Sequence, residues 1–222
     1  MKIKSLFYVV MDLIFPPRCV FCSKVVPSGS QVCEKCDAEI LRIDAVKCIY
    51  ISNMGEAILC AVPYLYQDKV RQSIIRFKFY GQKQFAAFYA EKMAEHILKS
   101  YLPLRFDAVT SVPISAERRK LRGYNQSELI ARAAAKQLNL PYYEYLVKTA
   151  DNKEQHKLNK KERNKNVKGV YKAIDGRDIA GKNILLIDDI VTTGATLREC
   201  ASVLLQSGAQ KVDCAAIAEV LA

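Results

Sequence analysis

The sequence of 222 residues contains no apolar run of the roughly 18 to 20 residues that a membrane-spanning helix requires, so no membrane span is expected. It has no internal repeat and no low-complexity segment. Its two histidines, His96 and His156, have no visible partner in the sequence, so we assign them no catalytic role. Acidic residues are few relative to basic ones: 34 Lys and Arg against 23 Asp and Glu give a formal net charge of +11. This excess favours an anionic partner, either a phosphorylated small molecule, a nucleic acid or an anionic membrane surface.

The N-terminus lacks the small-residue cleavage site of a signal peptide, although it begins like one. Lys2 and Lys4 precede an apolar run over 6–11, but Asp12 interrupts that run and Pro16-Pro17 ends it. The pattern predicts a short amphipathic helix and a cytoplasmic protein, and it disfavours export.

Cysteines are distributed unevenly, with six of the eight in the first sixty residues and the others, Cys200 and Cys214, near the end. This asymmetry predicts two units, a small cysteine-bearing module over 1–60 and a larger domain over 61–222.

Strand and helix patterns alternate throughout the larger domain. Strands are predicted near 61–66, 106–113, 142–148, 183–187 and 212–217, and helices near 68–79, 84–100, 126–138 and 195–207. This alternation predicts an α/β fold with a parallel, Rossmann-like sheet and right-handed crossovers.

The segment 184–196 carries the clearest chemistry. Four apolar residues predict a buried strand. Asp188 and Asp189 follow at its end, where open α/β sheets bind ligands and where we expect both acids to be exposed. Gly194 lets the backbone approach an oxyanion, and the start of the next helix adds backbone N–H donors. Three threonine hydroxyls can donate to phosphate oxygens: Thr192, Thr193 and Thr196. An ordinary strand-to-helix turn with a threonine cap is the structural alternative, and the acid pair alone also suits a metal.

At every position this block resembles the phosphoribosyltransferase signature of four apolar residues, two acids, two apolar residues and Thr-Thr-Gly-x-Thr. The resemblance implies that Asp188 and Asp189 hold the ribose hydroxyls of 5-phosphoribosyl 1-pyrophosphate (PRPP), bound with Mg²⁺. It implies a 5-phosphate loop made of Thr192, Thr193, Gly194, Ala195 and Thr196.

Two further blocks are similar to the ComF family of competence proteins, which joins a zinc module to a type I phosphoribosyltransferase domain. Residues 111–127 resemble its strand end and its Arg-Gly-aromatic-Asn-Gln element, and residues 155–171 resemble its second block. In that family's fold the turn after the first sheet strand faces the pyrophosphate. We therefore expect on the pyrophosphate side Val112, Pro113, Arg118, Arg119, Arg122, Lys161 and Arg163.

The end of the chain departs from the family pattern. The family's final strand often ends in Ala-Arg-Thr, whereas this chain has Ala218-Glu219-Val220. Any ligand contact made by that arginine has no carrier here.

Two Cys-x₂-Cys turns lie ten residues apart, which is typical of a structural zinc site. The four thiolates of Cys19, Cys22, Cys33 and Cys36 would bind one Zn²⁺ tetrahedrally. A pair of disulfides or a redox Cys-x₂-Cys are the alternatives, and a reducing cytoplasm disfavours the disulfides.

The remaining cysteines show no such pairing. Many ComF relatives carry a second set of paired cysteines, whereas Cys48 and Cys60 have no partner two residues along. We expect both to be buried apolar thiols, together with Cys200 and Cys214.

Basic side chains crowd the polar stretch 151–168, at Lys153, Lys157, Lys160, Lys161, Arg163, Lys165 and Lys168. The stretch is either a solvated loop, a lid over the pyrophosphate that includes Lys161 and Arg163, or a contact for a nucleic-acid backbone.

Three functions remain open. The chain is an enzyme that transfers phosphoribose from PRPP to a nucleobase or an amine, a binding module that senses PRPP without turnover, or an interaction protein that contacts a helicase or single-stranded DNA. Membership of the ComF family implies a role in DNA uptake during natural transformation.

Overall fold

The computed structural model describes residues 15–51, 54–101, 106–149 and 169–221. The predicted N-terminal helix and the basic stretch 151–168 lie outside these ranges. Among the described residues, no helix has both the length and the apolar character needed to cross a membrane.

The predicted α/β fold with a mostly parallel sheet is confirmed. In chain order the elements are α2 (Glu34–Glu39), β1 (Arg42–Ile51), β2 (Glu56–Leu65), α3 (Asp68–Phe79), α4 (Phe85–Ser100), β3 (Ala108–Ser111), α5 (Ala116–Arg122), α6 (Gln126–Gln137), β4 (Leu146–Lys148), β5 (Tyr171–Ala173), β6 (Asn183–Val191), α8 (Ala195–Gln206) and β7 (Lys211–Glu219). The main sheet has the order β1-β2-β7-β6-β3, and all its pairs are parallel except the antiparallel pair β1–β2. β4 and β5 form a separate antiparallel pair.

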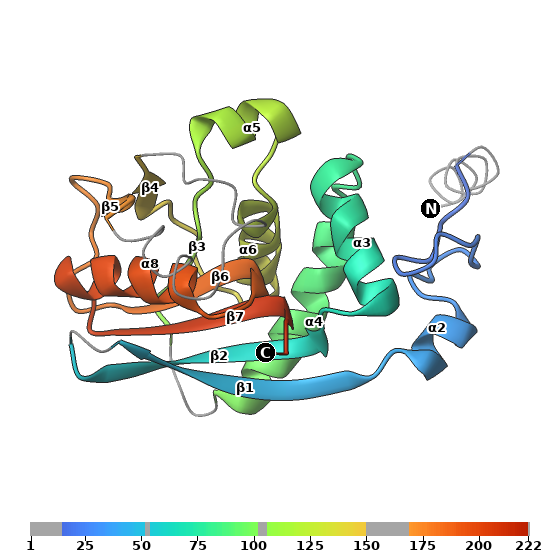
Figure 1. Cartoon of the computed structure of the whole chain (residues 1–222), viewed down its shortest axis with the longest axis horizontal. Coiled ribbons are helices and arrows are strands. Elements are labelled where there is room, and N and C mark those ends of the chain that lie inside the picture. The colour runs from blue at the N-terminus through green and yellow to red at the C-terminus, as the bar shows by residue number, and fades with distance from the viewer. Residues whose placement is uncertain (1–14, 52–53, 102–105, 150–168, 222) are drawn as a thin grey trace, which may run out of the picture.

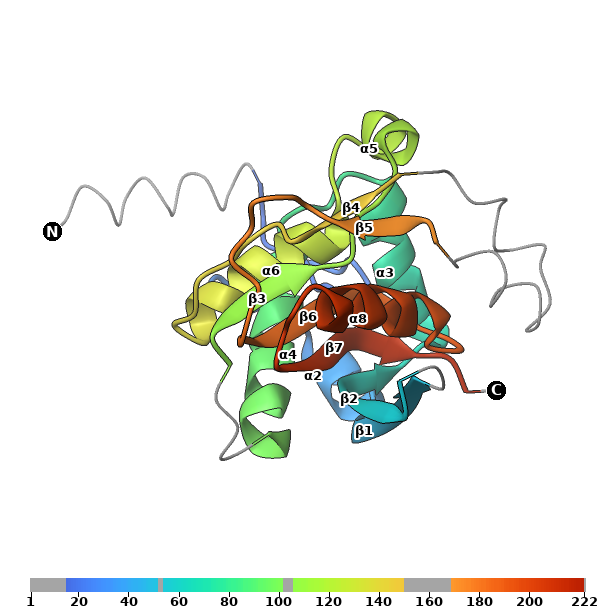
Figure 2. The same ribbon diagram turned by 90° about the vertical axis from the view of Figure 1, so that its left-hand side faces the viewer.

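Helices cover both faces of the sheet (Figures 1 and 2). α8 and the β4–β5 pair lie on one face, and α3, α4 and α6 lie on the other. Leu185 and Ile187 of β6 face the cluster that contains α4 and α6, whereas Ile184 and Leu186 face α8. A strand covered on both sides needs a continuous apolar run, which explains why this strand was clear in the sequence.

The sheet also contains elements that the sequence did not reveal. β1 alternates polar and apolar side chains and is half exposed, because it is the edge strand of the sheet. It pairs with β2, and the predicted boundary at residue 60 falls inside β2. The division of the chain at residue 60 stays a prediction. The strand expected over 142–148 is shorter than predicted and is confined to Leu146–Lys148.

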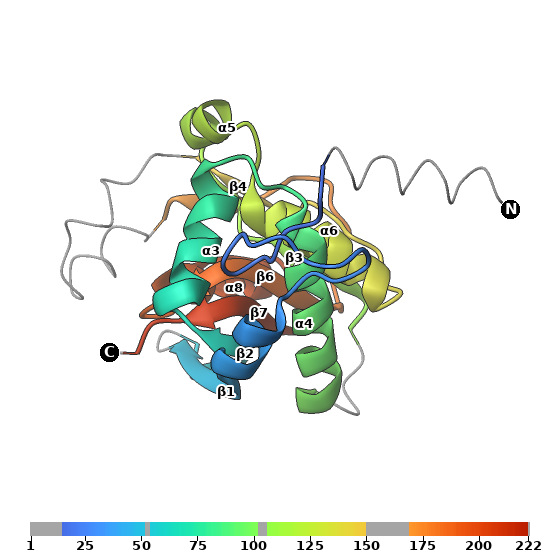
Figure 3. The ribbon, with the colours of Figure 1, turned by 90° about the vertical axis from the view of Figure 1, so that its right-hand side faces the viewer.

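The cysteine module lies beside α3 and α4 of the larger domain (Figure 3). The residues between its first two cysteines pack into the main core. Phe21 is 2% exposed and makes edge-to-face contacts with Tyr64 and Phe88. The carbonyl oxygen of Val20 accepts hydrogen bonds from Ser73 Oγ at 2.6 Å and from Arg76 at 3.0 Å. The first cysteine turn is therefore part of the main core and is held by α3.

Candidate functional site at the carboxyl edge of the sheet

The residues expected to bind the ligand gather where β6 and β3 end. The two strands are parallel, so their carboxyl ends meet at one edge of the sheet. The backbone N–H of Val112, one residue after β3, donates to the carbonyl oxygen of Ile187 at 2.9 Å. The turn after β3 is thereby fixed beside Asp188 and Asp189.

Asp188 is buried, which corrects the expectation that both acids lie at an exposed strand end. Asp188 is only 9% exposed, because β6 continues past it to Val191. Ser127 Oγ donates to Asp188 Oδ1 at 2.9 Å, and the backbone N–H of Asp189 donates to the same oxygen at 2.8 Å. Burial, together with the charge of Asp189, raises the pKa of Asp188 to about 7.

Asp189 pairs with a lysine that the sequence analysis missed. Lys78 Nζ, from the C-terminal end of α3, lies 2.9 Å from Asp189 Oδ2. The side chains are 17% and 14% exposed, so water screens this pair less than an open surface pair. Ser127 lies at the end of the block 111–127, but the sequence assigns it no role, because its contact with Asp188 spans 61 residues of sequence.

The predicted phosphate loop leads into α8, whose N-cap is Gly194. Gly194 has φ of +73°, and a Cβ there would lie 3.0 to 3.1 Å from three side-chain carbons of Ile49. Glycine is therefore required by the loop conformation and by β1, and not only by space for a phosphate. Lys47, also on β1, donates to the carbonyl oxygen of Thr192 at 3.3 Å and to Glu219 at 3.1 Å.

Glu219 occupies the place where the family pattern has arginine, and Lys47 supplies a cation beside it. This ion pair connects the edge strand β1 to the end of β7 and to the start of the loop. The loop is thus supported from β1, a strand that the sequence did not predict.

The residues expected on the pyrophosphate side divide into several groups. Val112 and Pro113 form the turn after β3, and Arg118 is partly exposed on α5. The Arg122 guanidinium lies 4.8 Å from the centre of the Phe79 ring and also donates to Gln126 at 3.2 Å. Lys161 and Arg163 lie outside the described residues.

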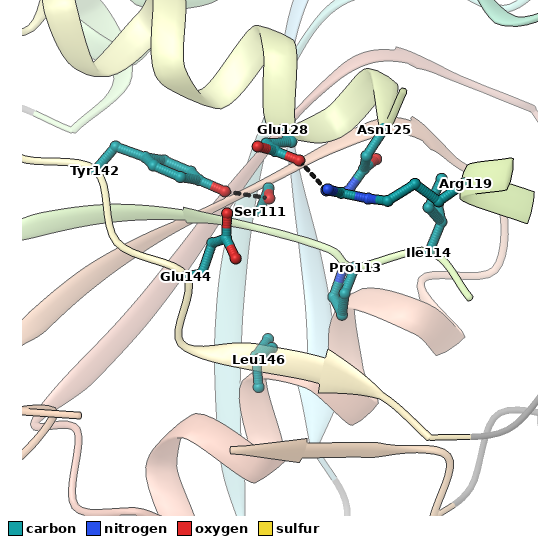
Figure 4. A pocket seen from close by; sticks show the side chains of 9 residues that line it. All are labelled: Ser111, Pro113, Ile114, Arg119, Asn125, Glu128, Tyr142, Glu144 and Leu146. Carbon is teal, nitrogen blue, oxygen red and sulfur yellow. Dashed lines mark hydrogen bonds and ion pairs between the residues drawn. The ribbon is translucent and has the colours of Figure 1, made fainter. Parts of the chain in front are cut away.

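Arg119 points into a small pocket beside the same turn (Figure 4). It pairs with Glu128, which also accepts from Arg132 at 3.0 Å. Across the pocket the hydroxyl groups of Ser111 and Tyr142 are 2.9 Å apart. Arg119 is thus held by the carboxylate of Glu128.

The four predicted zinc ligands come together. Their sulfur atoms all lie within 4.8 Å of one another, and Cys22 Sγ is 3.6 Å from Cys33 Sγ. A tetrahedron with Zn–S bonds of about 2.3 Å has sulfur atoms about 3.8 Å apart, so this arrangement fits Zn²⁺. Among the described residues, no second group of three or more His, Cys, Asp or Glu side chains comes together in this way.

Cys48 is exposed on β1, so the expectation of a buried thiol there is wrong. The other unpaired cysteines, Cys60, Cys200 and Cys214, are buried as expected. Cys48 faces outward because β1 is an edge strand, and its neighbour across the pair is Leu59.

Comparison with known proteins agrees with this two-part architecture. Residues 10–61 match the double zinc ribbon domain, and residues 125–222 match the phosphoribosyl transferase domain. The chain is 32% identical to the competence protein ComFC of Bacillus subtilis over 145 residues, 65% of this chain and 57% of that protein. It is 25% identical to the DNA utilization protein YhgH of Escherichia coli over 203 residues, 87% of this chain and 86% of that protein.

Together these matches support a ComF-family protein. Its larger domain has the type I phosphoribosyltransferase fold, and its cysteine module is a zinc-binding ribbon. The match with an adenine phosphoribosyltransferase structure covers 80% of this chain and 85% of that protein's chain, with 14% identity and a TM-score of 0.39. The match with ComFC spans little more than half the length of that relative.

We predict that this ComF-family protein binds about one zinc per chain, and that changing Cys19, Cys22, Cys33 or Cys36 to Ser abolishes stoichiometric binding. Cys60→Ser and Cys48→Ser are the controls, because neither cysteine belongs to the four-sulfur group. Elemental analysis of protein purified under reducing conditions gives the metal content. A disulfide between two of the four cysteines in such protein would contradict the assignment.

The pKa of Asp188 predicts how pH affects stability. The carboxyl group has a pKa of about 7 in the folded protein and about 3.9 when unfolded, so its contribution is present below pH 4 and is lost as pH rises through 7. Asp188→Asn cannot ionise. Between pH 5 and pH 8 the stability of the wild type should therefore fall relative to this variant, on the order of 2 kcal/mol.

Thermal or urea unfolding at the two pH values measures this difference. Asp178→Asn is the matched control, because the side chain of Asp178 is 83% exposed. Parallel pH profiles for the wild type and Asp188→Asn would show that the Asp188 pKa is not raised.

Proposed function

We propose that the chain binds PRPP, together with Mg²⁺, at the carboxyl edge of the sheet. The observation that supports this most directly is the placement of 184–196. It places Asp188 and Asp189 in the C-terminal half of β6, and α8 begins at Ala195, within the loop 192–196, with Gly194 as its N-cap. Acceptors for ribose hydroxyls and backbone donors for a phosphate then lie within one strand–loop–helix unit.

The residues would act mainly by positioning. The acids would orient the ribose, and the loop 192–196 would hold the 5-phosphate. Mg²⁺ bound with the ligand would neutralise part of the diphosphate charge. If transfer occurs, the bond from ribose C1 to the diphosphate oxygen breaks, diphosphate leaves with the electron pair, and an acceptor nitrogen bonds to C1 and releases a proton. The acceptor would be a nucleobase or an amine.

We propose a role in DNA uptake for this binding, since the relatives include competence proteins and a DNA utilization protein. A binding module that senses PRPP without turnover fits the same site. Incubation with labelled PRPP, Mg²⁺ and a panel of nucleobases separates the two, because only an enzyme releases diphosphate above background.

We predict that Asp189→Asn weakens the binding of PRPP about 5- to 30-fold, which corresponds to roughly 1 to 2 kcal/mol. The loss is modest because an amide keeps part of the hydrogen bonding of a carboxylate. Titration calorimetry with Mg²⁺ measures the affinity, and Asp178→Asn serves as a control of equal charge change. Asp189 suits this test better than Asp188, whose replacement also disturbs the buried contact with Ser127. Unchanged affinity in Asp189→Asn would contradict a ribose contact by this acid.

A second candidate function is binding of single-stranded DNA, and a particular surface favours it. α5 projects beside the C-terminal end of α3 (Figures 1 and 3). At this end of the molecule, large apolar side chains are exposed among basic ones. Tyr80 is 69%, Phe79 54% and Leu121 83% exposed. Arg122 lies over the Phe79 ring, which joins the two helices. Aromatic rings on which bases stack, set among cations, are typical of single-stranded nucleic-acid sites. A helicase is a further partner that the family resemblance suggests for this chain.

We predict that Tyr80→Ala weakens binding of a fluorescent oligothymidylate at least fivefold, because base stacking on an aromatic ring contributes roughly 1 to 3 kcal/mol. Fluorescence anisotropy at two salt concentrations measures the affinity. Tyr50→Ala on β1 is the matched control, since Tyr50 is 57% exposed and lies on the opposite edge of the sheet from β3. Equal binding by both variants would assign the DNA contact elsewhere.

A further inference from the structure

Helix α3 brings to the acid pair a cation that no sequence motif assigned to the ligand site. Lys78 lies one residue before the end of α3, and its ammonium group is 2.9 Å from Asp189 Oδ2. Its side chain is 17% exposed, whereas a solvated surface lysine would be mostly exposed. A largely buried ammonium needs an anionic partner, and in the absence of ligand Asp189 supplies it.

The position of Lys78 is fixed by contacts on both sides of α3. Towards the zinc module, Arg76 donates to the carbonyl oxygens of Val20 at 3.0 Å and Phe21 at 2.7 Å. Towards α6, Gln126 Nε2 donates to the carbonyl oxygen of Lys78 itself at 3.2 Å. The backbone of Lys78 is therefore held in place from both sides of the helix.

The backbone of Lys78 is also connected to the turn after β3, because Gln126 donates to Lys78 and the neighbouring Asn125 donates to the carbonyl oxygen of Val112 at 3.0 Å. Arg122, at the end of α5, donates to the side chain of the same Gln126 at 3.2 Å. α5 follows the turn 112–113, which the family resemblance places at the pyrophosphate. Two cations from different helices, Lys78 and Arg122, thus both contact Gln126 at the start of α6, beside that turn.

We propose that Lys78 is a diphosphate-binding residue that pairs with Asp189 until the ligand arrives. When the ribose hydroxyls donate to Asp189, the flexible lysine side chain turns its ammonium to a diphosphate oxygen on C1. Lys78 then distinguishes ribosyl ligands that carry the diphosphate from those that lack it. This inference rests on the proposed PRPP site and assigns a specificity role within it.

Titration calorimetry of Lys78→Met against PRPP and against ribose 5-phosphate, each with Mg²⁺, tests the proposal. We expect PRPP to bind at least tenfold more weakly than to the wild type, and ribose 5-phosphate to change less than threefold. Lys78→Arg keeps the charge and should retain most of the preference for PRPP. Lys69→Met is the matched control, because it removes the same charge from α3 at a lysine that pairs with Glu39.

The outcomes are separable. Equal weakening of both ligands would show that Lys78 only holds Asp189 in position, and unchanged affinity for both would show that it does not meet the ligand; either result overturns the proposal. If the wild type binds neither ligand, the PRPP site itself is refuted, and the Lys78 proposal with it. Zinc content and thermal unfolding report whether Lys78→Met folds. Lys78→Gln, which keeps a polar contact with Asp189, gives the same comparison if it does not.

Discussion

The burial of Asp188 is the constraint on which the arrangement of the site depends. A carboxyl group that is 9% exposed inside a sheet is costly unless its oxygens accept hydrogen bonds. Ser127, in the first turn of α6, provides one of them. The N-cap of the same helix, Asn125, donates to the carbonyl oxygen of Val112 at 3.0 Å, which ties the turn after β3 to α6. Satisfying one buried acid therefore positions two further elements of the candidate ligand site.

The zinc module contributes to this site indirectly. The residues between Cys19 and Cys22 pack into the main core, and their carbonyl oxygens hold Ser73 and Arg76 of α3. α3 in turn carries Lys78 to Asp189. A continuous chain of contacts thus connects the metal ligands to the ligand-binding edge. Such a chain is consistent with a structural role for zinc, since it stabilises an element that the site requires.

Sequence reasoning succeeded where the signal was local. The apolar run and the Thr-Gly loop predicted β6 and α8, and the cysteine spacing predicted that the four sulfur atoms come together. It failed where the determining contact was distant. Lys78 is far from Asp189 in the sequence, and nothing in the pattern around it shows that they meet. The alternating pattern of β1 was missed because an edge strand needs few apolar residues, and that is also why Cys48 is exposed.

The most direct test of the account is a crystal structure of the full chain with PRPP and Mg²⁺ at saturating concentration. We expect the 5-phosphate to lie over residues 192–196, the ribose hydroxyls to contact Asp188 and Asp189, and the diphosphate to point towards the turn after β3. PRPP bound at another place, or a vacant loop at a concentration where titration shows binding, would contradict it.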